Sequence, residues 1–301
     1  MRTCILVRTM AAIEVSGLTK TYGEVLANDD LTFSVREGEI FGYLGPNGAG
    51  KTTTIRTLMG FQSPTAGTAR VLGRDVRQES ELVAAKADIG YLPSDVGFDE
   101  GATGEEYLDL HASLKGDSRR GELLDLFEPP LSREIGNYST GNRRMLGIVQ
   151  AFMHDPDLVV MDEPTSGLDP LKQESFNRFL RGEADAGTTV FLSSHVLGEV
   201  RRICDRVGII REGRLAALEG IEDLLNRGGK RVRVHTDPPL DLDTLDLEGV
   251  VDPEQVGRET QFTFTGSYDA LLSTLGGYEV VDLEIDEPPI EDVFMHFYGE
   301  R

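Results

Sequence analysis

The sequence predicts an α/β fold with a largely parallel sheet, a helical subdomain within it and a small C-terminal α+β domain. Three observations carry this prediction. Short apolar runs alternate with helical patterns as far as residue 218, a stretch of about residues 97–155 is mostly helical, and the composition changes after residue 219. Alternation of strands with helices is typical of α/β proteins built on parallel sheets.

Residues 1–11 are expected to be an extension outside the folded domains. Their apolar piece, residues 4–7, is too short for the hydrophobic region of a signal peptide. A second methionine, Met10, comes just before a strand-like run at residues 12–15. We therefore expect translation to start at Met10, so that the preceding residues are dispensable.

The main domain is predicted to span residues 12–218. Its short apolar runs are bounded by Gly, Pro or polar residues and lie at residues 40–44, 158–161 and 189–192. Such runs suit strands that are buried on both faces of a sheet. Helical patterns separate them, at residues 52–59, 103–127 and 142–153.

The C-terminal domain is predicted to span residues 219–301. Residues 231–235 and 261–265 alternate between apolar and polar side chains, like half-buried strands. A helical pattern at residues 221–226 precedes them, and an amphipathic helical pattern at residues 290–298 follows. Mixed strands and helices of this kind indicate a small α+β domain.

The charge balance limits the classes of partner. The sequence has 30 Lys and Arg against 52 Asp and Glu, a net charge of −22. Duplex nucleic acid requires a basic binding surface, so we expect no nucleic-acid partner. Two interpretations of the acidity stay open: an ordinary acidic protein, or a halophilic protein whose self-repulsion is screened by salt. The two cysteines favour a reducing compartment, and no apolar run reaches the ~18 residues of a membrane span.

Residues 45–52 match the phosphate-binding pattern G-x-x-x-x-G-K-[ST] in full. The match follows the predicted strand at residues 40–44 and opens a helix, which is the context that a phosphate loop requires. The loop amides attract phosphate oxygens, Lys51 supplies a charge to the β- and γ-phosphates, and the Thr52 hydroxyl ligates Mg²⁺. The alternative is a glycine-rich turn that binds nothing. The predicted nucleotide-binding residues of this segment are Gly45, Pro46, Asn47, Gly48, Ala49, Gly50, Lys51, Thr52 and Thr53.

A second apolar strand ends in two carboxylates, Asp162 and Glu163. Asp162 is placed to hold Mg²⁺ directly or through water. Glu163 is placed to orient or deprotonate an attacking water molecule. Many strands end in acidic turn residues, so this signal is weak alone and becomes strong beside a phosphate loop. Together the two segments predict a P-loop NTPase that uses ATP and Mg²⁺.

Three further segments decide the class of NTPase, and they are Tyr-Ser-Thr-Gly-Asn at 138–142, Pro-Thr-Ser-Gly-Leu-Asp at 164–169 and Ser-Ser-His at 193–195. With them the sequence resembles the nucleotide-binding subunit of ATP-binding cassette (ABC) transporters over about residues 13–218. Five motifs occur in the family's order. The sequence is similar in detail to subunits that serve ABC-2-type permeases, which often carry a small C-terminal extension. The resemblance implies an ABC ATPase fold in which two subunits enclose ATP.

The resemblance implies roles for Tyr22 and for the 138–142 segment. Tyr22 matches the aromatic residue that stacks on adenine, although a plain turn tyrosine is the alternative. Ser139 and Gly141 match the signature residues that contact the γ-phosphate held by the other subunit, while Thr140 and Asn142 depart from the family pattern. Ser139 can also be read as a helix N-cap, and both roles are compatible because a helix N-terminus binds anions.

Three more residues follow from the resemblance. Asp169 matches the aspartate that links the two sites across the dimer, although an Asp before Pro170 also suits a helix start. His195 matches the switch histidine that contacts the γ-phosphate. We expect His195 and Glu163 to be the catalytic residues. Ser94 occupies the position of a family glutamine that contacts Mg²⁺ and the attacking water. Because the serine side chain is shorter than that of glutamine, three alternatives stay open: a water molecule bridges the gap, Asp95 takes the place of the glutamine, or hydrolysis is slower.

The resemblance implies an ATP-hydrolysing subunit that energises a separate polytopic membrane permease, with export favoured over import. It implies an ATP-dependent homodimer, or a heterodimer with a second ATPase subunit, held peripherally at the cytoplasmic face of the cell membrane. The helical lobe, residues 97–138, is the expected permease-docking surface. The alternative is a soluble ABC ATPase that acts as a mechanical clamp on ribosomes or DNA. A third hypothesis is a P-loop kinase or GTPase outside the ABC family. The 138–142 segment, with Ser139 and Gly141, and His195 argue against it.

Overall fold

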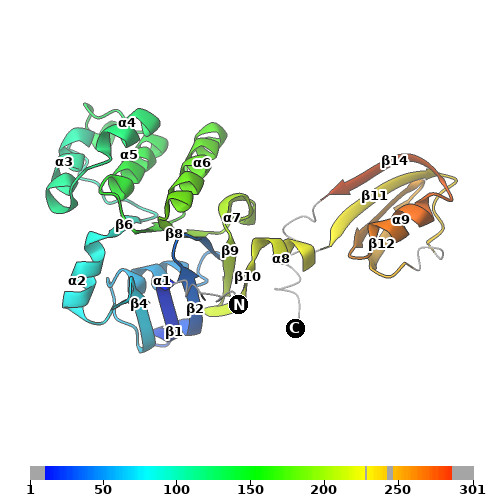
Figure 1. The fold of residues 1–301 in the computed structure, drawn as a ribbon, viewed down its shortest axis with the longest axis horizontal. Helices are drawn as coiled ribbons and strands as arrows, with labels where there is room; N and C mark the ends of the chain where they lie inside the picture. The colour runs from blue at the N-terminus through cyan, green and yellow to red at the C-terminus, as the bar shows by residue number, and fades with distance from the viewer. Residues whose placement is uncertain (1–10, 228, 243–246, 287–301) are drawn as a thin grey trace, which may run out of the picture. The chain divides into compact units, whose positions relative to one another are not determined.

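The structure is a computed structural model that describes residues 11–227, 229–242 and 247–286 (Figure 1). The chain divides into two compact units, Met1–Leu218 and Glu219–Arg301. The expected N-terminal extension up to Met10 and the amphipathic segment at residues 290–298 lie outside the described residues.

A six-stranded sheet with the order β10-β9-β3-β8-β7-β6 forms the centre of the first unit. Its strands are β3 (Ile40–Leu44), β6 (Ile89–Leu92), β7 (Leu158–Asp162), β8 (Thr189–Ser194), β9 (Arg206–Arg211) and β10 (Arg214–Gly220). The pairs from β9 through β3, β8 and β7 to β6 are parallel. Every residue of β3, β7 and β8 is buried, as their apolar runs predict, and the α/β fold class is confirmed.

A second sheet of the first unit is antiparallel and was not predicted. Its order is β2-β1-β4-β5. Its strands are β1 (Ala11–Tyr22), β2 (Val25–Arg36), β4 (Ala66–Val71) and β5 (Arg74–Asp75). Register shifts interrupt the pairing of β1 with β2 at several positions along β1. Such shifts break the regular alternation of side chains that marks a half-buried strand, so only a short part of β1 was recognisable.

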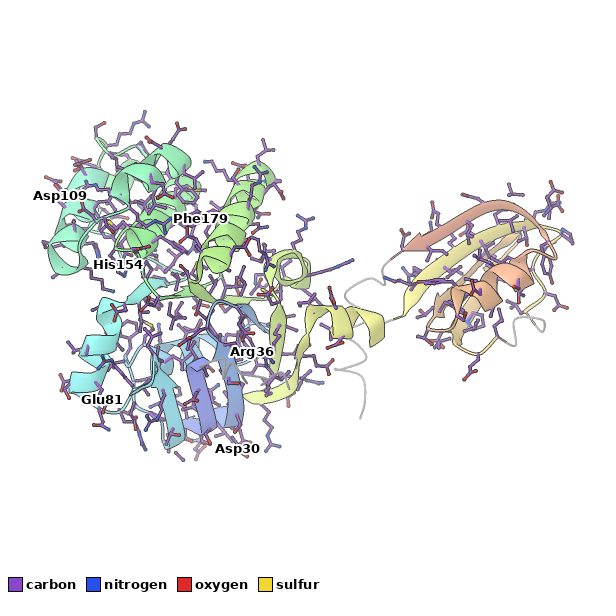
Figure 2. The ribbon with its side chains drawn as sticks, in the orientation of Figure 1. Asp30, Arg36, Glu81, Asp109, His154 and Phe179 are labelled. Atoms are coloured by element: carbon purple, nitrogen blue, oxygen red, sulfur yellow. The ribbon has the colours of Figure 1, made fainter. Side chains whose placement is uncertain are left out.

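In the first unit, helices α3, α4, α5 and α6 group together on the side opposite β1, β2 and β4 (Figure 1). The described helices of this unit are α1 (Lys51–Leu58), α2 (Glu79–Ala87), α3 (Gly104–Lys115), α4 (Arg120–Phe127), the 3₁₀ turn η1 (Ile135–Asn137), α5 (Thr140–Phe152), α6 (Pro170–Ala186) and α7 (Leu197–Ile203). Residues 103–127, predicted as continuously helical, are two helices. Gly116 ends α3 at a φ of 88°, a conformation that favours glycine. Phe179 on α6 (labelled in Figure 2) packs edge-to-face against Phe127 of α4 and Phe152 of α5, with ring centroids 5.1 and 4.9 Å apart.

An aromatic cluster joins the two sheets behind the phosphate loop. Phe33, Phe41, Tyr43 and Phe191 stack with ring centroids 5.5–6.3 Å apart. The Tyr43 hydroxyl lies 3.2 Å from Oγ1 of Thr54 on α1. This contact ties the first helix to the end of β3, so the loop between them has a defined shape.

The second unit contains an antiparallel sheet with the order β12-β13-β11-β14. Its elements are α8 (Ile221–Arg227), β11 (Lys230–Asp237), β12 (Val250–Val256), β13 (Glu259–Phe264), α9 (Tyr268–Leu275) and β14 (Glu279–Asp286). Its buried core consists of Val232, Val234, Leu240, Phe262, Phe264, Leu271 and Leu275. Among the described helices of both units, none has the length and apolar character to cross a membrane.

Candidate functional site

The loop of residues 45–50 joins the carboxyl end of β3 to α1, and its glycines allow close packing. A Cβ atom on Gly45 would lie 2.4 Å from the carbonyl oxygen of Ile210, and one on Gly50 would lie 2.5 Å from that of Ala27. Gly50 also has a φ of 107° and is the N-cap of α1. Because no larger residue fits at these positions, the loop lies tightly against β2 and β9, with the N-terminus of α1 at the site.

Lys51 is buried and its ammonium group lies inside the loop. Its Nζ donates hydrogen bonds to the carbonyl oxygens of Gly45, at 2.6 Å, and Pro46, at 3.4 Å. Nζ also lies 3.2 Å from Oε1 of Glu163, an ion pair without hydrogen-bond geometry. The loop thus presents one positive charge, already facing a carboxylate.

Glu163 lies between two basic groups. Its other carboxylate oxygen, Oε2, is 2.9 Å from Nδ1 of His195, whose side chain is half exposed. Glu163 has a φ of 51°, a left-handed conformation that costs free energy in a non-glycine residue. The local fold therefore holds Glu163 against Lys51 and His195, and the structure brings three predicted residues together.

Asp162 is held through both of its carboxylate oxygens. Oδ2 accepts a hydrogen bond from Thr52 Oγ1 at 3.0 Å, and Oδ1 accepts one from Ser193 Oγ. Ser193 is fully buried and stands opposite Asp162 in the parallel register of β7 and β8. Ser193 belongs to the Ser-Ser-His segment at residues 193–195, in which only His195 was assigned a role. Nothing in the sequence indicated that the Ser193 hydroxyl contacts Asp162.

The Thr52 hydroxyl and the Asp162 carboxylate suit a magnesium ion. Both are oxygen donors, which Mg²⁺ prefers, and Mg²⁺ commonly takes its other ligands from water and phosphate. Among residues 11–227, 229–242 and 247–286 there is no group of three or more His, Cys, Asp or Glu side chains that could hold a metal.

A cavity of about 460 Å³ opens over these groups. Ten of its lining residues were predicted, and they are Pro46, Asn47, Gly48, Gly50, Lys51, Thr52, Thr53, Ser94, Asp162 and Glu163. Five were not, and they are Val25, Leu26, Ala27, Glu212 and Gly213. The unpredicted residues come from β2 and from the turn between β9 and β10. They carry no motif, so only the packing of the loop against these elements reveals them.

Tyr22 does not line this cavity. It ends β1 opposite Val25, and its ring is nearly half exposed. Lys20 Nζ lies 5.1 Å from the ring centroid, and the hydroxyl contacts Oε1 of Gln62. The two predicted loop residues Gly45 and Ala49, which shape the loop from behind, also lie outside the lining.

Ser139, Gly141 and Asp169 lie away from the cavity of their own chain. Ser139 is the N-cap of α5 and accepts a hydrogen bond from the Asn142 amide at 3.2 Å. Asp169 is the N-cap of α6 and accepts one from the Lys172 amide at 3.0 Å. The capping role that the sequence left open is therefore present at both positions.

Comparisons with known proteins agree with this geometry. The ABC transporter family pattern matches residues 28–166. The Nod factor export ATP-binding protein I of Mesorhizobium japonicum is 34% identical over 304 residues, covering 96% of this chain and 87% of its own. The daunorubicin/doxorubicin resistance ATP-binding protein DrrA of Streptomyces peucetius is 40% identical over 236 residues, covering 74% and 71%. A solved structure of an ATP-binding subunit of an ABC transporter is 31% identical with a TM-score of 0.67, covering 72% of this chain and 92% of that chain. The chain therefore belongs to the ABC transporter family as an ATP-binding subunit that hydrolyses ATP to drive transport.

Proposed function

We propose that this chain binds Mg²⁺-ATP between two subunits and drives export through a separate polytopic permease. One observation carries the proposal: Lys51, Thr52, Asp162 and Glu163 converge on one cavity, while the exposed Ser139 does not line it. Relatives named for Nod factor export and for daunorubicin/doxorubicin resistance support export as the direction.

Each residue at or beside the cavity has its own role in ATP hydrolysis. Lys51 and the loop amides bind the β- and γ-phosphates. Thr52 and Asp162 would hold Mg²⁺, and the chemistry that the ion would supply there is neutralisation of charge on the phosphate oxygens. Glu163 orients the attacking water and accepts its proton, and His195 positions that carboxylate through its 2.9 Å contact. The ion pair of Glu163 with Lys51 must open when a phosphate binds between them.

The exposed start of α5 supports a dimer. Ser139 and Gly141 stand at the positive N-terminal end of a 13-residue helix, where an anion is stabilised. Since neither residue lines the cavity of its own chain, they complete the site of a second subunit. Asp169, also exposed and capping α6, is a further residue of that interface.

The helical lobe supports the permease contact. Leu110 and Leu114 of α3 are 60% and 72% exposed. Four residues apart, they lie on the same face of the helix and form an apolar surface. A permease bound there would hold this subunit peripherally at the cytoplasmic face of the cell membrane.

The test is capture of the tagged chain from detergent-solubilised membranes of its own organism. A polytopic membrane protein should copurify with the wild type. It should be lost with the double variant Leu110→Asp and Leu114→Asp but kept with Val256→Asp, a control on the second unit that changes an 82% exposed side chain. Capture of ribosomes or DNA, with no membrane protein, would support the clamp alternative and overturn the proposal.

A further inference from the structure

We propose that Arg144 is a positioning residue that couples the two ATP sites of the dimer. It links the start of α5, which carries Ser139 and Gly141, to the loop after β6, which carries Ser94. This inference rests on the proposed function, because it needs a dimer in which Ser139 of one subunit completes the site of the other.

The link is a pair of hydrogen bonds to consecutive carbonyl groups. Arg144 Nη1 donates to the carbonyl oxygen of Pro93 at 2.8 Å, and Nη2 donates to that of Ser94 at 2.9 Å. Arg144 is only 6% exposed. A planar guanidinium that contacts two acceptors sets both the position and the orientation of the loop, which a single donor cannot do.

Carboxylates at and near the cavity favour the positively charged form of the buried Arg144. Burial lowers the pKa of the guanidinium, while the carboxylates of Asp162, Glu163 and Asp95 favour its charged form through space. Within the described parts of the chain, no carboxylate lies within ion-pair distance of Arg144. An apolar side chain would fill this site at lower desolvation cost, as at the neighbouring Met145. We therefore infer that Arg144 serves the site and not only the stability of the helix.

The short side chain of Ser94 explains why the loop must be positioned. Ser94 lines the cavity, and the family resemblance of the sequence matches its position to a longer glutamine. A glutamine reaches its target by adjusting several torsion angles, whereas a serine hydroxyl goes only where its backbone places it. The two bonds from Arg144 fix that backbone. A phosphate bound at Ser139 restrains α5, and through Arg144 it restrains Ser94 at the other ATP site.

The test compares Arg144→Gln with Arg144→Lys and with the control Arg143→Gln. Arg143 is the adjacent residue of α5, but it donates to Glu100 Oε1 at 3.0 Å and does not bond the loop of Ser94. Two readouts are used. The first is amide hydrogen exchange of residues 94–96 without nucleotide, and the second is the ATP dependence of hydrolysis together with binding of a fluorescent ATP analogue.

For Arg144→Gln we expect faster exchange at residues 94–96, a kcat about 10-fold lower, and a Hill coefficient reduced to about 1, with ATP-analogue affinity changed less than about 2-fold. Arg144→Lys, which keeps the charge but bonds one carbonyl, should be intermediate. Arg143→Gln should match the wild type.

Three results would overturn the inference: unchanged exchange in a folded Arg144→Gln protein, the same losses in Arg143→Gln, or a rise in KM with kcat unchanged. Should Arg144→Gln not fold, wild-type behaviour of Arg144→Lys in both readouts overturns the inference as well. Failure of the slowly hydrolysing variant Glu163→Gln to dimerise with ATP would refute the proposed function. The exchange comparison would still show whether Arg144 positions the loop.

Discussion

Lys51 and Glu163 form an ion pair across the cavity, with Nζ 3.2 Å from Oε1. The lysine begins α1, which follows β3, and the glutamate follows β7. The pair therefore depends on the sheet, which holds β3 and β7 parallel on either side of β8 with their carboxyl ends at one edge. A phosphate placed against Lys51 meets the negative charge of Glu163. Glu163 therefore opposes phosphate binding electrostatically, although we propose that it is also the group that activates water.

Replacing Glu163 by Gln should slow hydrolysis about 10²–10⁴-fold, because the amide cannot accept the proton of the attacking water. ATP affinity should be equal or higher, since the competing charge is removed and Asp162 still suits Mg²⁺. The ATP-bound dimer should accumulate on size exclusion. Glu212→Gln is the control, because it removes another carboxylate of the same cavity, which forms an ion pair with Arg211. Undiminished hydrolysis in Glu163→Gln would remove Glu163 from the catalytic role and leave Ser94 and Asp95 to be tested.

Adding Ser139→Arg to Glu163→Gln tests the shared site directly. The larger side chain stands where the phosphate of a second subunit must lie, so the double variant should bind ATP but elute as a monomer. A dimer of the double variant would contradict the enclosure of ATP between two subunits.

Ser193→Ala should weaken the metal site, because Asp162 loses the hydroxyl that donates to its Oδ1. Leaving this buried oxygen without a donor costs about 1–3 kcal/mol in the free energy of unfolding, measurable by urea titration. The Mg²⁺ concentration needed for half-maximal hydrolysis should rise. Ser194→Ala is the matched control, because Ser194 is also buried but donates to Glu199 at 2.9 Å. An equal shift in both variants would show that Ser193 has no specific effect on Asp162.

His154, labelled in Figure 2, should make the first unit sensitive to acid. Burial, aided by the charge of Lys115, lowers the pKa of His154 from 6.5 to about 4, and its buried Nε2 has no hydrogen-bond partner. The unfolded chain therefore takes up a proton first as the pH falls. The contribution of neutral His154 to the stability of the fold is fully present above pH 6.5, and it is lost progressively as the pH falls from 6.5 to 4. His154→Gln should flatten urea-unfolding profiles over this window, whereas the control His235→Gln should not.

A chain ending at Leu218 should bind ATP as the full chain does. Every cavity residue precedes this position, from Val25 to Gly213, and the two units form separate cores. We expect dimer lifetime or permease coupling to change instead. Titration with a fluorescent ATP analogue measures affinity. Its loss in a truncated protein with native circular dichroism would show that the second unit contributes to the site.

The net charge of −22 predicts that salt stabilises the fold. At 0.01 M salt the Debye length is ~30 Å, so the self-repulsion of the carboxylates is hardly screened. Circular dichroism and ATPase rates should therefore show more folded, more active protein in molar KCl than in dilute buffer. Equal stability at both ionic strengths would favour the interpretation as an ordinary acidic protein.

Much of the site could be predicted because its key groups follow recognisable strands. The runs of β3, β7 and β8 are apolar throughout, since both faces of the sheet are covered, and the phosphate loop and Asp162 directly follow or end such strands. The carboxyl ends of parallel strands meet at one edge. This shared edge explains why Lys51, Asp162 and Glu163, which were predicted separately from their motifs, line one cavity.

Other parts of the fold and site had no local signal. The antiparallel sheet was missed because register shifts disturb the alternation of β1, and the division of residues 103–127 depended on one glycine. Ser193 and Arg144 are ordinary polar residues in the sequence. Their importance comes from Asp162 and Ser94, which lie 31 and 50 residues away along the chain.

The sequence by itself determined the chemistry of this protein: the phosphate loop, the two carboxylates at the end of the apolar strand β7 and the family with its ATPase activity. These depend on residue types at short, fixed spacings, which the backbone turns directly into local geometry. Only the tertiary structure decided that Glu163 faces Lys51 and His195 and that the Ser193 hydroxyl donates to Asp162. It also decided that β2 and the β9–β10 turn line the cavity, and that Arg144 donates hydrogen bonds to the loop that carries Ser94. Each of these contacts joins residues far apart in the chain, and their proximity depends on the packing of all the strands and helices between them.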